Sequence, residues 1–310
     1  MGTVFRPLDL DLDVISNVSA ITENADAPVR RIWRVVRPLE AAAIAFVPLL
    51  LVAVFALPEP LRRSYVFDYT DPTLVTAAVS PFVHIEVSHL LVNLVGYAII
   101  VPLVYALSVL SGRRRGFWIV FVTFVLVFPP ILSYLNLAVP RPTYGVGFSG
   151  VILAFVGYLP IAIADYVETH LGVGPREMVA PMTFFLGLAL IAILSVQSVV
   201  PSNATVLLGT AGLVVATLLC ALLFWIAALD EGRFRPRARA TAGLPGYFEL
   251  ATAAGILFVG IQFVAFPGDP RVAGGVVNLY VHLLGYALGF ISVYSTLQVD
   301  ARLPGDAFGT

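Results

Sequence analysis

The chain has 310 residues, of which 59% are hydrophobic and only 12% are charged, and its mean hydropathy is +0.93. This composition excludes an ordinary soluble domain and indicates a protein embedded in the lipid bilayer. The formal net charge of −1 identifies no partner, and we expect no nucleic-acid binding. The single cysteine, Cys220, excludes a disulfide within one chain.

Apolar runs dominate the chain after its first 38 residues, which we expect to form a cytoplasmic N-terminal tail. A span needs about 20 helical residues to cross the hydrocarbon core. We predict an all-α polytopic membrane protein with about eight transmembrane helices in residues 39–299, followed by a cytoplasmic tail at 300–310. The expected spans are 39–57, 86–110, 116–137, 149–165, 180–200, 204–229, 247–266 and 275–297. Internal prolines leave the count open between seven and nine.

The basic residues predict the orientation of these spans. All eighteen are arginine, and an even number of spans puts fourteen of them on the side of the two chain ends. Arginine-rich loops favour the cytoplasm, so we predict a multi-pass protein of the cell membrane with both termini cytoplasmic. The four arginines expected on the external side are Arg62, Arg63, Arg141 and Arg271.

Three polar sites interrupt the apolar spans, where each polar group needs a partner or a function. The first contains His89 and Asn93, which are four residues apart and share a helix face, whereas His84 points away from that face. The second contains Ser149, which begins the fourth span, and the third contains His282 in the last span. The starts of even-numbered spans lie on the external side, so these sites should meet at similar depth just below that surface.

Small residues accompany the last two sites. Gly150, Ala154 and Gly157 follow Ser149 along one helix face, and Gly285 and Gly289 follow His282 along another. Such stripes permit close packing of membrane helices. His282 is therefore predicted to approach Ser149.

This combination of residues favours acyl-transfer chemistry. A serine hydroxyl becomes nucleophilic when a nearby imidazole accepts its proton, which assigns Ser149 as nucleophile and His282 as general base. Asn93, His89, Gly147 and the N–H of Ser149 are the expected donors to the oxyanion. No acidic residue lies near His282 in the sequence, so we predict a Ser/His dyad without a third acidic member. No cofactor and no metal are expected.

These three segments together resemble the rhomboid family of intramembrane serine proteases. The family pattern of two histidines and an asparagine is matched by His84, His89 and Asn93, and its Gly-x-Ser-Gly motif by residues 147–150. Its late His-x-x-Gly-x-x-x-Gly pattern is matched by residues 282–289. The resemblance implies a rhomboid-like helical bundle that cleaves transmembrane protein substrates. It also implies oxyanion contacts from His89 and Asn93, and a role for His84 in supporting the first external loop and a water-filled cavity.

The chain departs from the family pattern in three places. Two additional spans are predicted between Ser149 and His282, and we expect them to pack at the periphery of the bundle. The first external loop, residues 58–81, lacks the Trp-Arg pair common in the family. Leu153 stands where the family often has an aromatic residue that packs on the base.

Two other functions stay open at this point. A rhomboid-like protein without protease activity would bind membrane clients, although such relatives usually lose the serine or the histidine. A small-solute transporter would show discontinuous helices and internal repeats, and no convincing repeat is present. His170 is expected to be a solvated loop residue. The oligomeric state and the identity of substrates are not predicted.

Overall fold

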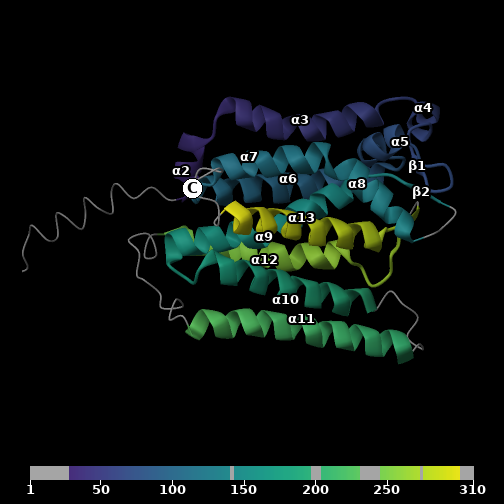
Figure 1. The fold of residues 1–310 in the computed structure, drawn as a ribbon. Helices are drawn as coiled ribbons and strands as arrows, with labels where there is room; N and C mark the ends of the chain where they lie inside the picture. The colour runs from purple at the N-terminus through teal and green to yellow at the C-terminus, as the bar shows by residue number, and fades with distance from the viewer. Residues whose placement is uncertain (1–27, 140–142, 197–203, 231–244, 273–274, 301–310) are drawn as a thin grey trace, which may run out of the picture.

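The structure is a computed structural model that describes residues 28–139, 143–196, 204–230, 245–272 and 275–300 (Figure 1). Within these ranges, seven helices are long and apolar enough to cross a membrane, and a bent pair of shorter helices forms an eighth span if it is counted as one. The chain is therefore an all-α polytopic membrane protein. The N-terminal residues 1–27 and the C-terminal residues 301–310, for which tails are predicted, lie outside the described residues.

Most predicted spans coincide with long helices. These are α3 (Pro38–Phe55), α6 (Val87–Leu110), α9 (Ser149–Tyr166), α10 (Arg176–Val196), α11 (Ala204–Asp230), α12 (Tyr247–Ala265) and α13 (Leu279–Asp300). Shorter elements lie between them or precede them. They are α2 (Pro28–Val35), α4 (Glu59–Arg63), α5 (Leu74–Val79), the 3-10 turns Ser80–Phe82 and Asn136–Ala138, the π-helix Val167–Leu171, and two antiparallel pairs, β1 (Phe67–Asp68) with β2 (Tyr144–Gly145) and β3 (Arg271–Val272) with β4 (Gly275–Val276).

The third predicted span, residues 116–137, is not one straight helix. It consists of α7 (Arg114–Leu126) and α8 (Phe128–Leu135), which are bent by 50° relative to each other. Pro129 and Pro130 have no N–H group, so the hydrogen bonds that would continue α7 into α8 cannot form.

Helix α9 forms the centre of the bundle. All its residues from Gly150 to Tyr166 are buried, as expected for a helix that is apolar on every side. Helix α13 packs along α9, and α6 and α10 also contact α9. A Cβ atom on Gly157 would lie 2.0 Å from the Tyr286 carbonyl oxygen, and one on Gly289 would lie 2.2 Å from that of Ala154. The small-residue stripes therefore let the two backbones touch.

The additional helices in the second half of the chain differ in their packing. Helix α11 packs on α10 at one edge of the bundle (Figure 1). Many of its apolar side chains are exposed. Because α13 contacts α9 directly, no inserted helix separates them. Helix α12 contacts both α9 and α10, so only α11 has the fully peripheral position expected for the inserted spans.

The elements that carry the described arginines lie at opposite ends of the bundle (Figure 1). We call the end that holds α2 and the starts of α3, α7, α10 and α12 the arginine-rich end. The opposite end, which holds α4, α5 and the β1–β2 pair, is called the loop end. The arginine-rich end carries Arg30, Arg31, Arg34, Arg37, Arg113, Arg114, Arg115 and Arg176, and the loop end carries Arg62, Arg63 and Arg271.

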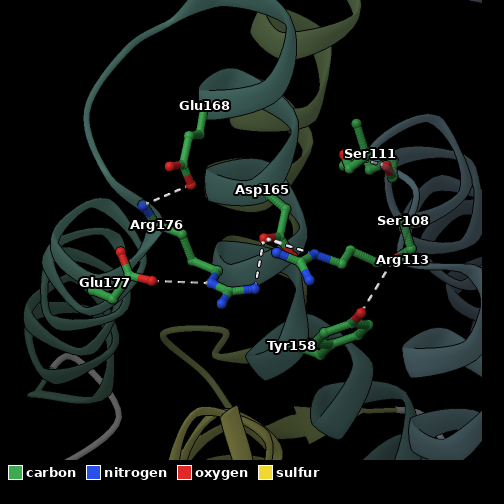
Figure 2. A network of polar contacts seen from close by, with 9 residues as sticks. Ser108, Ser111, Arg113, Tyr158, Asp165, Glu168, Arg176 and Glu177 are labelled. Atoms are coloured by element: carbon green, nitrogen blue, oxygen red, sulfur yellow. Dashed lines mark hydrogen bonds and ion pairs between the residues drawn. The ribbon is translucent and has the colours of Figure 1, made fainter. Parts of the chain in front are cut away.

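A buried carboxylate forms ion pairs that connect several helices at the arginine-rich end (Figure 2). Asp165, near the end of α9, is only 5% exposed, and it forms ion pairs with Arg176 at 3.1 Å and with Arg113 at 3.6 Å. The Arg176 N–H donates to Glu168 at 3.1 Å. These contacts join the α6–α7 turn, α9 and α10, and no sequence pattern pointed to Asp165.

The expectation that His170 is a solvated loop residue is wrong. His170 is buried, and its Nε2 lies 3.1 Å from the Leu110 carbonyl oxygen. Its ring also packs against those of Tyr166 and Tyr247. The cause is the π-helix Val167–Leu171, which continues α9 by one turn and keeps the ring inside the bundle.

Candidate active site

Ser149 is the first residue of α9 and lies at the loop end of the bundle. The segment before it is fixed by the β1–β2 pair and by the Gly147 N–H, which donates to the Ser80 carbonyl at 3.2 Å. Gly147 has a φ of 99°, and a Cβ atom there would lie 2.3 Å from His89 Cε1. Only glycine fits this turn, because both the backbone conformation and the neighbouring ring exclude a side chain.

His282, near the start of α13, contacts Ser149. The His282 Nε2 lies 2.8 Å from Ser149 Oγ, and its Nδ1 lies 2.8 Å from the Ala265 carbonyl oxygen. A carbonyl oxygen only accepts hydrogen bonds, so Nδ1 carries the ring proton and Nε2 accepts a hydrogen bond from the Ser149 hydroxyl. The tautomer needed by a general base is thus fixed by the backbone of α12. His282 is 7% exposed.

The end of α12 supplies two contacts to this imidazole. The Ala265 carbonyl belongs to the last turn of the helix, where carbonyl groups have no intrahelical partner. The buried Phe266 ring stands edge-on to the His282 ring, with centroids 6.0 Å apart and an interplanar angle of 86°. An aromatic ring thus packs on the histidine from α12, although Leu153 on α9 is not aromatic.

His84 and His89 form a pair of rings beside the Gly147 turn. Their centroids are 5.0 Å apart with an interplanar angle of 69°. His84 is fully buried, and neither of its ring nitrogens makes a hydrogen bond of ordinary geometry within the described residues. Burial, with smaller contributions from His89 and Arg62, lowers the pKa of His84 from 6.5 to about 3. His84 is therefore neutral at pH 7.

The predicted oxyanion donors are only partly free. The Ser149 N–H has no intrahelical partner because it is the first of the helix, and the α9 dipole adds positive potential there. The Gly147 N–H is already bonded to Ser80. The Asn93 amide donates to the His89 carbonyl at 2.8 Å, while its buried Oδ1 has no partner within the described residues. The contact with His89 uses one of the two N–H donors of the Asn93 amide.

Arg62 is a further residue of this region that the sequence analysis did not assign. It is buried, and its guanidinium donates to the carbonyls of His84 at 2.5 Å, Ile85 at 3.2 Å and Leu57 at 3.1 Å. It also lies over the Phe55 ring, 4.3 Å from the centroid. Through its hydrogen bonds, Arg62 connects Leu57, which lies just after the end of α3, to the segment that leads into α6.

No protein-family model, curated protein or solved structure matches this chain. Within the described part of the chain, no carboxylate contacts His282, and its two polar partners are Ser149 and Ala265. The Ala265 carbonyl and the Phe266 ring could not be found from sequence motifs, because neither belongs to a pattern around the serine or the histidine.

Proposed function

We propose that this chain is an intramembrane serine endopeptidase of the rhomboid type that cleaves transmembrane segments of other membrane proteins. The observation that carries the proposal is the 2.8 Å contact between His282 Nε2 and Ser149 Oγ inside an apolar helical bundle. Polar pairs at such positions are costly and are typically retained for function. The proton on Nδ1, directed to Ala265, gives the imidazole the tautomer that accepts a proton from serine.

In the proposed reaction, Ser149 Oγ attacks the carbonyl carbon of a substrate peptide bond while His282 Nε2 takes the hydroxyl proton. The resulting imidazolium gives this proton to the leaving amine as the carbon–nitrogen bond breaks, which leaves an ester on Ser149. Water then attacks the ester carbon while His282 Nε2 takes a proton from it, and this proton passes to Ser149 Oγ as the ester bond breaks and the acid product departs. The Ala265 carbonyl accepts from Nδ1 throughout and stabilises the imidazolium, which is the role of the acid in a triad.

The oxyanion would be bound at the start of α9. The Ser149 N–H is the donor that needs no rearrangement, since it has no partner within the helix. His89 lies beside the Gly147 turn and could donate from its ring, and Asn93 could donate with the N–H that does not bond the His89 carbonyl. The proposal assigns no metal and no cofactor.

The arginine distribution supports an orientation for this site. The arginine-rich end would face the cytoplasm, which places both ends of the described chain on that side of a cell membrane. Ser149 and His282 lie at the loop end, so cleavage would occur just below the external surface.

Transport of a small solute is less well supported. Between Ser149 and Asp165, which lie at opposite ends of the central helix α9, Tyr158 is the only residue with a polar side chain. The Tyr158 hydroxyl is itself paired with Ser108 at 3.1 Å. The side chains of α9 thus offer no continuous polar path from one end of the bundle to the other.

The test compares wild type with Ser149→Ala, His282→Ala and the matched control Ser292→Ala, all reconstituted in liposomes with a fluorescent transmembrane substrate. We expect the first two variants to lose at least about 1,000-fold in cleavage rate and the control to retain it. A fluorophosphonate probe gives a readout that does not depend on the substrate, and it should label wild type but not Ser149→Ala. Cleavage by either dyad variant, or folded wild type that neither cuts nor reacts with the probe, would refute the proposal.

A further inference from the structure

Four exposed arginines at the arginine-rich end have no carboxylate partner within the described residues. Other arginines of this end do have carboxylate partners. Arg113 and Arg176 pair with Asp165 (Figure 2), and Arg114 pairs with Glu40. The two buried carboxylates of this end, Asp165 and Glu40, are thus already paired with other arginines. These four arginines are Arg30, Arg31, Arg37 and Arg115.

Two of these arginines lie at the start of apolar helix faces that point outward from the bundle. Arg115 begins a stripe on α7 that continues through Ile119, Val122 and Leu126, which are 39%, 50% and 66% exposed. These positions recur at helical spacing and share one face. In a membrane this face contacts lipid tails, so Arg115 lies where the hydrocarbon meets the phosphate layer.

Arg37 has the same relation to α3. It immediately precedes the helix, and Leu39, two residues later, is 84% exposed. Farther along α3, Phe46 and Leu49 are 61% and 67% exposed, as expected for a helix that faces lipid. Arg37 is therefore also placed at the boundary between lipid tails and headgroups.

Contacts around Arg114 bring these two arginines to one region. The Arg114 guanidinium donates to the Val35 carbonyl at 2.6 Å and pairs with Glu40, which ties the start of α7 to the junction of α2 and α3. Arg37 lies in that junction, and Arg115 follows Arg114. Helix α2 lies at the same end of the bundle (Figure 1), where Ile32 and Val36 pack on the core.

We propose that Arg37 and Arg115, with Arg30 and Arg31 on α2, bind the phosphate of an anionic phospholipid. A guanidinium group presents a planar pair of donors that matches phosphate oxygens, and the lipid tails would lie on the exposed faces of α3 and α7. Two features favour an anionic phospholipid: the positive charge of these arginines, and their position at the boundary between lipid tails and headgroups. A free phosphate would satisfy the charge but would gain nothing from the apolar stripes.

The test is native mass spectrometry of the full chain in nonionic detergent, titrated with phosphatidylglycerol or with phosphatidylcholine of the same acyl chains. The double variant Arg37→Gln/Arg115→Gln is compared with the matched control Arg63→Gln/Arg271→Gln at the loop end. Each arginine should contribute about fivefold to phosphatidylglycerol affinity, so the first variant should bind about 25-fold more weakly, with the control unchanged. Thermal unfolding checks that both variants are folded.

Three outcomes would overturn the proposal. Equal affinity for phosphatidylglycerol and phosphatidylcholine would show that charge is not recognised. Unchanged binding by a folded Arg37→Gln/Arg115→Gln variant would indicate that other groups, such as acidic residues elsewhere in the chain, occupy these arginines. Displacement of phosphatidylglycerol by millimolar inorganic phosphate would identify a site for a soluble anion. None of these results depends on proteolysis, so the proposal stands or falls separately from the proposed function.

Discussion

Replacing Gly285 with alanine should separate the two helices that carry the proposed dyad. A Cβ atom on Gly285 would lie 2.1 Å from the Gly150 carbonyl oxygen, whereas real Cβ contacts are not shorter than 3.0 Å. The obstacle is backbone, so no side-chain rotation relieves it, and α13 must move away from α9 by about 0.9 Å. His282 is three residues away on the same helix, and its 2.8 Å contact with Ser149 would lengthen beyond hydrogen-bonding range.

The expected effects are large on rate and moderate on stability. A displacement of about 1 Å at reacting groups costs about 100-fold in rate, and overpacking of this kind costs about 1–3 kcal/mol of stability. Cleavage in liposomes and thermal unfolding in detergent measure the two effects. Gly289→Ala meets the Ala154 carbonyl at 2.2 Å one turn farther from His282, so it should lose similar stability but less activity.

Gly212→Ala on α11 is the matched control, because nothing lies within 4 Å of its Cβ position. It should change stability by less than about 1 kcal/mol and leave cleavage unchanged. The reasoning is refuted if Gly285→Ala cleaves at the wild-type rate with an unchanged unfolding temperature.

Three further substitutions test the surroundings of the site. The pKa of His84 is about 3 in the folded chain and 6.5 ordinarily, so the unfolded chain binds a proton first and folding stability falls as the pH drops below 6.5. His84→Gln should reduce the stability lost between pH 7 and pH 5 by about 2 kcal/mol in denaturation experiments. A pH profile of stability identical to that of wild type would contradict this. Arg62→Met should lower stability by about 2–3 kcal/mol in thermal unfolding, because the carbonyls of His84 and Ile85 lose their buried donor, and unaltered unfolding would count against that role. Asp165→Asn should cost about 3–5 kcal/mol, since Arg113 and Arg176 then lack their buried counter-charge, and a variant as stable as wild type would disprove the importance of the pair.

Helix positions were predictable from sequence because a run of apolar residues has few alternatives in a membrane. The boundaries of α6, α11 and α12 agree with the expected spans 86–110, 204–229 and 247–266 to within one residue. The approach of His282 to Ser149 also followed, because the glycine stripes indicate which helix faces meet.

Features that depend on the path of the chain between spans were not predictable. The sequence places Arg62 in an external loop, and nothing in its neighbours shows that it donates to carbonyls more than twenty residues away. His170 lies in a polar stretch after the fourth predicted span, yet the π-helix holds it inside the bundle. Asp165 looks like the polar end of a span, and its burial results from two arginines that tertiary structure brings to it.

The hydrogen bond from His282 to Ala265 limits what substitution experiments can detect. Its acceptor is a main-chain atom, which every residue type at position 265 would supply. A complete scan of side chains would therefore find two groups that the proposed reaction needs, although the proposal assigns it three. Only a change that moves the end of α12, or replaces the amide after Ala265 with an ester whose carbonyl accepts more weakly, would reveal the third.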